Sequence, residues 1–135
     1  MSKPRYGWWS YAKAMARGYP ALLEKAEELR RHSMVADYSG QIKAPGASRT
    51  TEAAALRQLP PALQAELDAV ALALDGLRRH RGSARLRLRI VEMVYFRQTH
   101  TLYGAAAAVH VSEATAKRYN GDFLRSIARA RGLLD

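Results

Sequence analysis

Side chains that could recognise a nucleic acid recur at helical spacing after Ser112, near the C-terminus of the chain. Arg118 is the strongest candidate for reading a base, because one guanidinium can donate to O6 and N7 of the same guanine. Glu113, Thr115 and Lys117 lie within the same two helical turns and are secondary candidates. Ser112 itself has the hydroxyl of a good helix N-cap and is also among the residues expected to contact DNA. The chemistry this pattern predicts is recognition of double-stranded DNA in its major groove.

Further arginines flank this segment on both sides. Arg125, Arg129 and Arg131 follow along the same expected helix, where they would meet backbone phosphates rather than bases. Six more arginines fall within twelve residues before the segment: Arg78, Arg79, Arg81, Arg85, Arg87 and Arg89. These six could hold the flanking DNA backbone or an anionic surface of a partner protein, or they could form a solvated run.

The residues that commonly carry catalysis are not arranged for it. The chain has no cysteine, and its four histidines show no spacing typical of metal ligands. Phosphoryl chemistry would require clustered acidic residues to hold Mg²⁺, whereas the few acidic residues of the C-terminal half are scattered. We therefore expect no enzyme, no metal and no cofactor.

Positive charge is concentrated in the last part of the chain. The 135 residues carry a formal net charge of +10. Twelve of the 22 basic residues, but only four of the 12 acidic ones, lie from Gly76 onward. A basic segment of this kind attracts polyanions, because binding releases the counterions condensed on them. Double-stranded DNA is therefore the first partner to expect.

Length and hydropathy favour a small soluble protein. A chain of 135 residues suits one compact domain, or a small domain with a helical attachment. The longest apolar run, at 105–109, is far below the roughly 20 residues that a membrane span needs. The first residues contain no apolar stretch typical of a signal peptide. These features predict a cytoplasmic protein with no membrane contact.

Apolar spacing predicts an all-α fold. A first helix is expected from Trp8 to about Arg17, with residues 18–20 breaking it and Pro20 opening a second helix. The aromatic residues near the start are expected to anchor a helical core rather than stack on bases. Residues 33–48 are expected to be a loop or linker, and Thr50–Glu52 to cap a short helix that ends at Pro60.

The next expected helix opens at Pro61 and carries leucines and a valine at heptad spacing: Leu63, Leu67, Val70, Leu74 and Leu77. Packing within the chain explains this seam, with a homodimer interface as the alternative. A helix over Arg85–Tyr95 follows. We expect an N-terminal helical region with a loop over residues 1–60, and a helical linker with a C-terminal DNA-binding domain over 61–135. Since the C-terminal helices have their own apolar stripes, a fragment from Gly76 should remain helical.

Residues 101–120 match a helix-turn-helix. Ala105, Ala106 and Val109 form an apolar stripe, and Ala106 is small enough for two helices to approach closely. Val111 would plug the turn before the Ser112 cap. His110 stands where glycine is usual, and histidine is among the residues that best tolerate a left-handed backbone. If Ala116 faces the core, 100° per residue places Arg118 on the opposite side.

The stretch 85–131 resembles the C-terminal DNA-binding domain of bacterial sigma factors. The residues that match its pattern are Val94-Tyr95-Phe96, Thr101-Leu102, Ala105-Ala106 and Val111-Ser112. The whole chain is similar to phage late-transcription regulators of the ArpU and RinA type, through Trp8-Trp9-Ser10-Tyr11, Tyr19-Pro20 and Thr50-Thr51-Glu52. The resemblance implies a transcriptional regulator of phage or prophage origin that acts at a promoter or operator, with RNA polymerase as a further partner. Glu113 and Ala114 differ from the usual sigma pair after the cap, so no promoter preference is implied.

Two other functions are compatible with a basic helix-turn-helix chain. The first is a phage DNA-packaging component similar to a small terminase subunit, which works as a ring. The second is an interaction module whose basic face binds an acidic protein.

Overall fold

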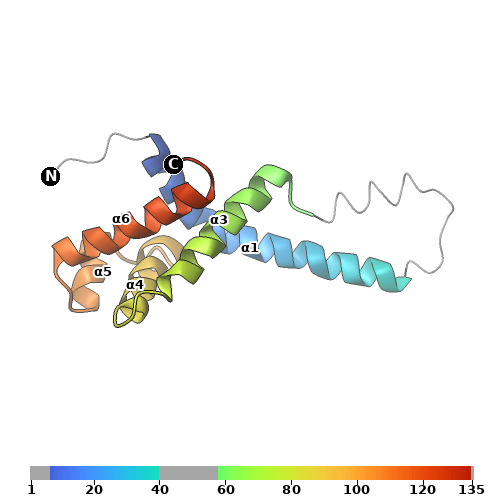
Figure 1. Cartoon of the computed structure of the whole chain (residues 1–135). Coiled ribbons are helices and arrows are strands. Elements are labelled where there is room, and N and C mark those ends of the chain that lie inside the picture. Colours follow the sequence, from blue (N-terminus) through green and yellow to red (C-terminus); the bar gives the residue numbers. More distant parts are fainter. Residues whose placement is uncertain (1–6, 40–57, 135) are drawn as a thin grey trace.

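A computed structural model describes residues 7–39 and 58–134, with only the backbone described over 33–39. Within these residues the fold is all-α and contains no strand, as the apolar spacing predicts. The helices are α1 (Gly7–Ser39), α3 (Pro61–Leu77), α4 (Ala84–Val91), the π-helical turn η1 (Glu92–Phe96), α5 (Leu102–Ala108) and α6 (Glu113–Ala130). The long helix α1 crosses α3 and extends beyond the rest of the bundle (Figure 1).

The expected break at residues 18–20 is wrong, because α1 runs through it as one helix of 33 residues with Pro20 inside. Proline lacks an N–H, so the carbonyl of Ala16 loses its usual helical donor. Packing of the turns that lead up to this position explains why the helix continues. Ala12 and Ala16 are fully buried, and the ring of Tyr19 lies 5.5 Å from that of Phe96. The expected loop from residue 33 is also wrong as far as Ser39.

Residues 40–57 lie outside the described part of the chain, and with them the short helix expected after Thr50–Glu52. The next expected helix is confirmed as α3, which begins at Pro61. Its seam residues Leu67, Val70 and Leu77 are buried inside the chain, together with Ala69 and Ala73. Packing within the chain therefore accounts for most of the seam.

The helix expected over Arg85–Tyr95 is present, but its last turn is π-helical. The amide of Arg97 donates to the carbonyl of Glu92 at 2.7 Å, five residues earlier. Within this π-helical turn, the side chains of Tyr95 and Met93 point to different parts of the interior. Tyr95 joins a cluster with α1 and α6, whereas Met93 joins a cluster with α5.

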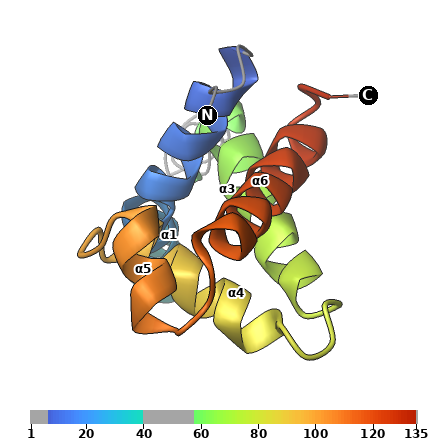
Figure 2. The same cartoon turned by 90° about the vertical axis from the view of Figure 1, so that its left-hand side faces the viewer.

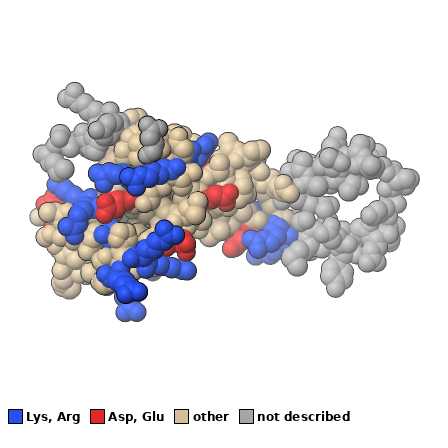
Figure 3. Space-filling view, in the orientation of Figure 1, with Lys and Arg blue, Asp and Glu red and all other residues tan. Residues whose placement is uncertain are grey.

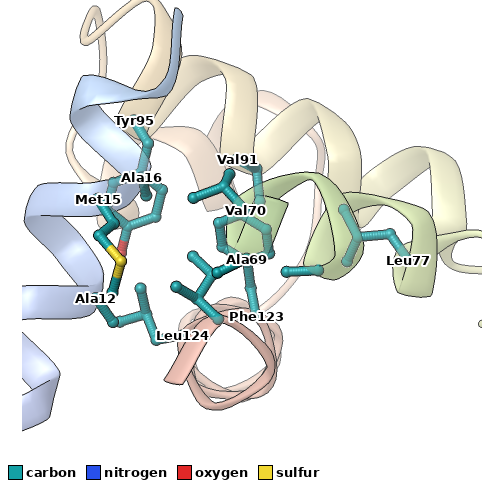
Figure 4. Close-up of a cluster of buried hydrophobic side chains, with 12 residues drawn as sticks. Ala12, Met15, Ala16, Ala69, Val70, Leu77, Val91, Tyr95, Phe123 and Leu124 are labelled. Carbon is teal, nitrogen blue, oxygen red and sulfur yellow. The ribbon is translucent and has the colours of Figure 1, made fainter. Parts of the chain in front are cut away.

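The interior consists of two hydrophobic clusters. The large cluster joins α1, α3, the end of α4 with η1, and the second half of α6 (Figure 4). Its members are Ala12, Met15, Ala16, Ala69, Val70, Ala73, Leu77, Val91, Tyr95, Phe123, Leu124 and Ile127. The small cluster joins α4, η1, α5 and the first half of α6, and its members are Ile90, Met93, Ala105, Ala106, Val109, Ala116 and Tyr119.

The helix α1 therefore shares one core with the C-terminal helices, and the chain is not divided at residue 60 into two separate cores. Trp8, Trp9 and Tyr19 pack against the large cluster, so these aromatic residues do anchor the core. None of the helices over 7–39 and 58–134 combines the length and the apolar character needed to cross a bilayer.

Candidate nucleic-acid interface

The helices α5 and α6 are joined by a four-residue turn, Val109 to Ser112, at one end of the bundle (Figure 2). His110 has a φ of 62°, so the left-handed conformation expected at this position is present. Val111 donates its N–H to the carbonyl of Ala106 at 3.0 Å and packs its side chain on the small cluster. Together these features fix the angle at which α6 leaves the turn.

Side-chain hydroxyls cap both helices of this unit. Ser112 Oγ accepts from the N–H of Thr115 at 3.0 Å and donates to Thr115 Oγ1 at 2.8 Å. Thr101 Oγ1 accepts from the N–H of Gly104 at 3.0 Å. The predicted N-cap at Ser112 is confirmed, and its hydroxyl is therefore committed to the helix. Thr115 is half-buried and keeps its own hydroxyl hydrogen available to a ligand.

The first two turns of α6 expose the residues that sequence reasoning selected. Glu113, Ala114, Lys117 and Arg118 are exposed, while Ala116 is fully buried on the opposite side. Lys117 Nζ pairs with Glu113 Oε1 at 3.1 Å, which neutralises part of its charge. Arg118 has no carboxylate within 4 Å among the described residues, and its guanidinium lies 5.6 Å from the ring of Tyr119. Arg118 is therefore the strongest unneutralised donor at this end of the helix.

Arg125 and Arg129 are exposed further along α6, as expected. The guanidinium of Arg125 folds back over Gly121 of the same helix. Its Nη1 atom lies 3.2 Å from the position that a Cβ atom of residue 121 would occupy. It also pairs with Asp122 at 3.4 Å. Arg129 has no such partner within the described range. Arg131 is half-buried, and its Nε atom is enclosed without an acceptor.

The arginines of α4 divide into two kinds. Arg85 and Arg89 are exposed and can reach an external phosphate. Arg87 cannot, so its assignment to the DNA-binding set is wrong. Its side chain is only 8% exposed and bonds Asp122 Oδ2 at 3.1 Å and Ser83 Oγ at 3.0 Å. Its guanidinium also lies 4.2 Å from the ring of Tyr119. Arg87 therefore joins α4 to α6 from inside.

All acidic side chains over residues 76–134 are engaged by neighbouring cations. Glu92 pairs with Arg97 at 3.7 Å, Glu113 pairs with Lys117, and Asp122 pairs with both Arg87 and Arg125. The arginines Arg85, Arg89, Arg118 and Arg129 have no carboxylate partner in the part of the chain that the structure describes. Basic side chains are visible over the part of the molecule that contains α4 and α6, and a separate basic group lies toward the far end of α1 (Figure 3).

A buried hydrogen bond anchors the middle of α6. The hydroxyl of Tyr95 donates to Oδ1 of Asn120, and both side chains are buried. Burial raises the pKa of Tyr95 to about 12, so the phenol keeps its proton at neutral pH. Sequence reasoning missed this pair because its partners are 25 residues apart. A polar residue on the otherwise apolar face of α6 was the only available signal.

Among the described residues, no three His, Cys, Asp or Glu side chains gather where they could hold a metal ion. No protein-family model, curated protein or solved structure matches the chain. Assignment of a function therefore depends on the geometry and charge of the helix-turn-helix end.

Proposed function

We propose that this protein binds double-stranded DNA sequence-specifically and regulates transcription, with α6 entering the major groove. The observation that carries the proposal is the exposed, capped N-terminal half of α6. It presents Arg118 outward while Ala116 and Tyr119 hold the helix on the small cluster. A recognition helix needs this combination of a fixed entry angle and an exposed first two turns.

The residues around α6 supply the contacts that position such a helix. Arg85, Arg89 and Arg129 are exposed and free of carboxylates within the described residues, so each can hold a backbone phosphate. About six phosphate contacts would give log Kd a salt dependence with a slope near 5 in magnitude. The resemblance of residues 85–131 to sigma-factor DNA-binding domains extends the proposal to promoter or operator sites, in a regulator of phage or prophage origin that works beside RNA polymerase.

The test begins with selection of bound sequences from random duplex DNA, followed by affinity measurements on the selected site. Arg118→Ala should cost roughly 1–3 kcal/mol at that site and relax the preference at one base pair. Arg129→Ala is the matched control on the same helix, because Arg129 is exposed and has no carboxylate partner within the described residues. It should weaken selected and random sequences equally and lower the salt slope by about one.

Three results would count against the proposal. Absence of duplex binding at low salt would leave an interaction module as the better explanation. Equal losses on both DNAs for Arg118→Ala would remove it as a base reader. A ring of eight or more subunits in light scattering would favour DNA packaging over transcription regulation.

A further inference from the structure

A pocket of about 540 Å³ lies beside the helix-turn-helix, between α1, η1, α6 and the segment that leads into α5. Its polar lining residues are Lys13, Arg17, Gln98, His100, Thr101 and Asn120. Val94, Tyr95 and Leu102 form the rest of its wall. None of the described residues that line this pocket, which we call the cationic pocket, carries a carboxylate. It brings two basic residues of α1 next to the helices that form the DNA-binding unit.

The polar groups of the cationic pocket are arranged to donate hydrogen bonds. Asn120 is 7% exposed, and its Oδ1 is already occupied by the hydroxyl of Tyr95. Its amide N–H groups have no acceptor among residues 7–39 and 58–134, although the side chain lines the pocket. Thr101 Oγ1 accepts from Gly104, so its own hydrogen remains available. The wall therefore supplies donors that the protein itself leaves unused.

Positive charge accompanies these donors. Arg17 is exposed and has no carboxylate within 4 Å in the described part of the chain. The positive charge of Arg17 acts on Tyr95, which lines the same pocket: it lowers the pKa of that phenol, although burial raises the pKa more. His100 bonds Thr99 Oγ1 through Nδ1 at 2.8 Å, which leaves Nε2 for another partner. A ligand that fits must be anionic and rich in acceptor oxygens, as a phosphate group is.

We infer that the cationic pocket binds a phosphate group, held by Arg17, Lys13 and the buried amide of Asn120. If the phosphate belongs to the DNA backbone, this inference rests on the proposed function. Thr101 caps α5 and Asn120 lies in α6, so the pocket adjoins the helices proposed to bind DNA. The helix α1 then forms part of the DNA interface, beyond the residues that sequence reasoning selected. A free phosphorylated small molecule presents the same chemistry, and the experiment separates the two sources.

The first arm measures duplex binding of full-length protein with Arg17→Gln, at several salt concentrations. Arg30→Gln is the matched control, because Arg30 is an exposed arginine on the same helix outside the pocket. If the phosphate is that of DNA, Arg17→Gln should weaken binding about three- to tenfold and lower the salt slope by about one. Arg30→Gln should leave the slope unchanged, and Arg17→Lys should restore most of the affinity.

The second arm titrates inorganic phosphate and pyrophosphate into the protein without DNA and follows backbone amide resonances. Saturable shifts at Thr101 and Gly104 that disappear in Arg17→Gln would assign the pocket to a free phosphorylated ligand. This arm remains informative if the protein binds no duplex, so failure of the proposed function is distinguished from failure of the pocket. Equal effects of Arg17→Gln and Arg30→Gln on DNA, together with no such shifts, would overturn the inference.

Discussion

The two hydrophobic clusters differ in what they contain and in what they hold. Four of the five largest fully buried side chains lie in the large cluster: Phe123, Leu124, Ile127 and Val70. The small cluster has only Ile90 of this group, and three of its seven members are alanines. Both clusters share α6, whose first half packs on the small cluster and whose second half packs on the large one. The recognition half of α6 therefore packs on a small, alanine-rich cluster, whereas most of the largest buried side chains hold its other half against α1 and α3.

The largest effect is expected when α1 and most of α3 are removed, which tests whether the small cluster can hold the C-terminal helices by itself. The sequence favours a helical fragment from Gly76, but the shared core leads to the opposite expectation. Without α1 and most of α3, Phe123, Leu124 and Ile127 lose the packing partners that these two helices supply. A fragment of about 60 residues is marginal even with a complete core. The fragment should lose cooperative thermal unfolding by circular dichroism. A sharp melt close to that of the full chain would show that the small cluster is sufficient.

A pair of truncations compares the clusters within the intact chain. Phe123→Ala should lower the free energy of unfolding by about 3–5 kcal/mol, because it removes a fully buried ring from the large cluster. Val109→Ala in the small cluster should cost about 2 kcal/mol, since two buried methyl groups are lost. Denaturant titration measures both. Equal losses would contradict the assignment of most stability to the large cluster.

The ion pair between the helices offers a third test. Asp122→Ala leaves the guanidinium of Arg87 buried without its carboxylate, and we expect a loss of about 3 kcal/mol. Arg125→Ala is the control, because it removes only the exposed partner of the same carboxylate and should cost about 0–1 kcal/mol. Chemical denaturation of both variants distinguishes them. A loss as small as that of the control would mean that Arg87 finds solvent or another acceptor.

The smallest expected change in the free energy of unfolding comes from replacing His110, in the turn between α5 and α6. His110→Gly relieves a left-handed conformation that costs an L-residue about 1–2 kcal/mol, while glycine loses about 0.4–1 kcal/mol through unfolded-chain entropy. The net gain in the free energy of unfolding should be about 0.5 kcal/mol. His110→Val should lower stability, because a β-branched residue fits this conformation poorly. A stabilising valine would contradict the role of backbone strain.

Local rules predicted the parts of the fold whose determinants are close in sequence. Pro61 opens α3, Ser112 caps α6, and His110 takes the left-handed turn position, and each depends on a few neighbouring residues. The exposure of Arg118 opposite Ala116 also follows from helical spacing alone.

Long-range contacts explain the predictions that were wrong. Pro20 carries the local signal of a break, but burial of Ala16 and the contact of Tyr19 with Phe96 keep α1 continuous. Arg87 has the sequence context of a surface arginine, yet its partner Asp122 is 35 residues away. The same applies to the cationic pocket, which unites α1 with α6. No spacing within either segment could have indicated these contacts.

The π-helical turn η1 restricts the number of residues that this segment of the chain can have. A π turn holds one residue more than the α-helical turn it replaces, so deleting one residue from Glu92–Phe96 would restore a regular helix. The deletion would also rotate the two flanking halves of the segment against each other by about 100°. Tyr95 could then no longer meet Asn120 while Ile90 keeps its place in the small cluster. Homologous chains that conserve both contacts should therefore keep the length of this segment even where its residues change.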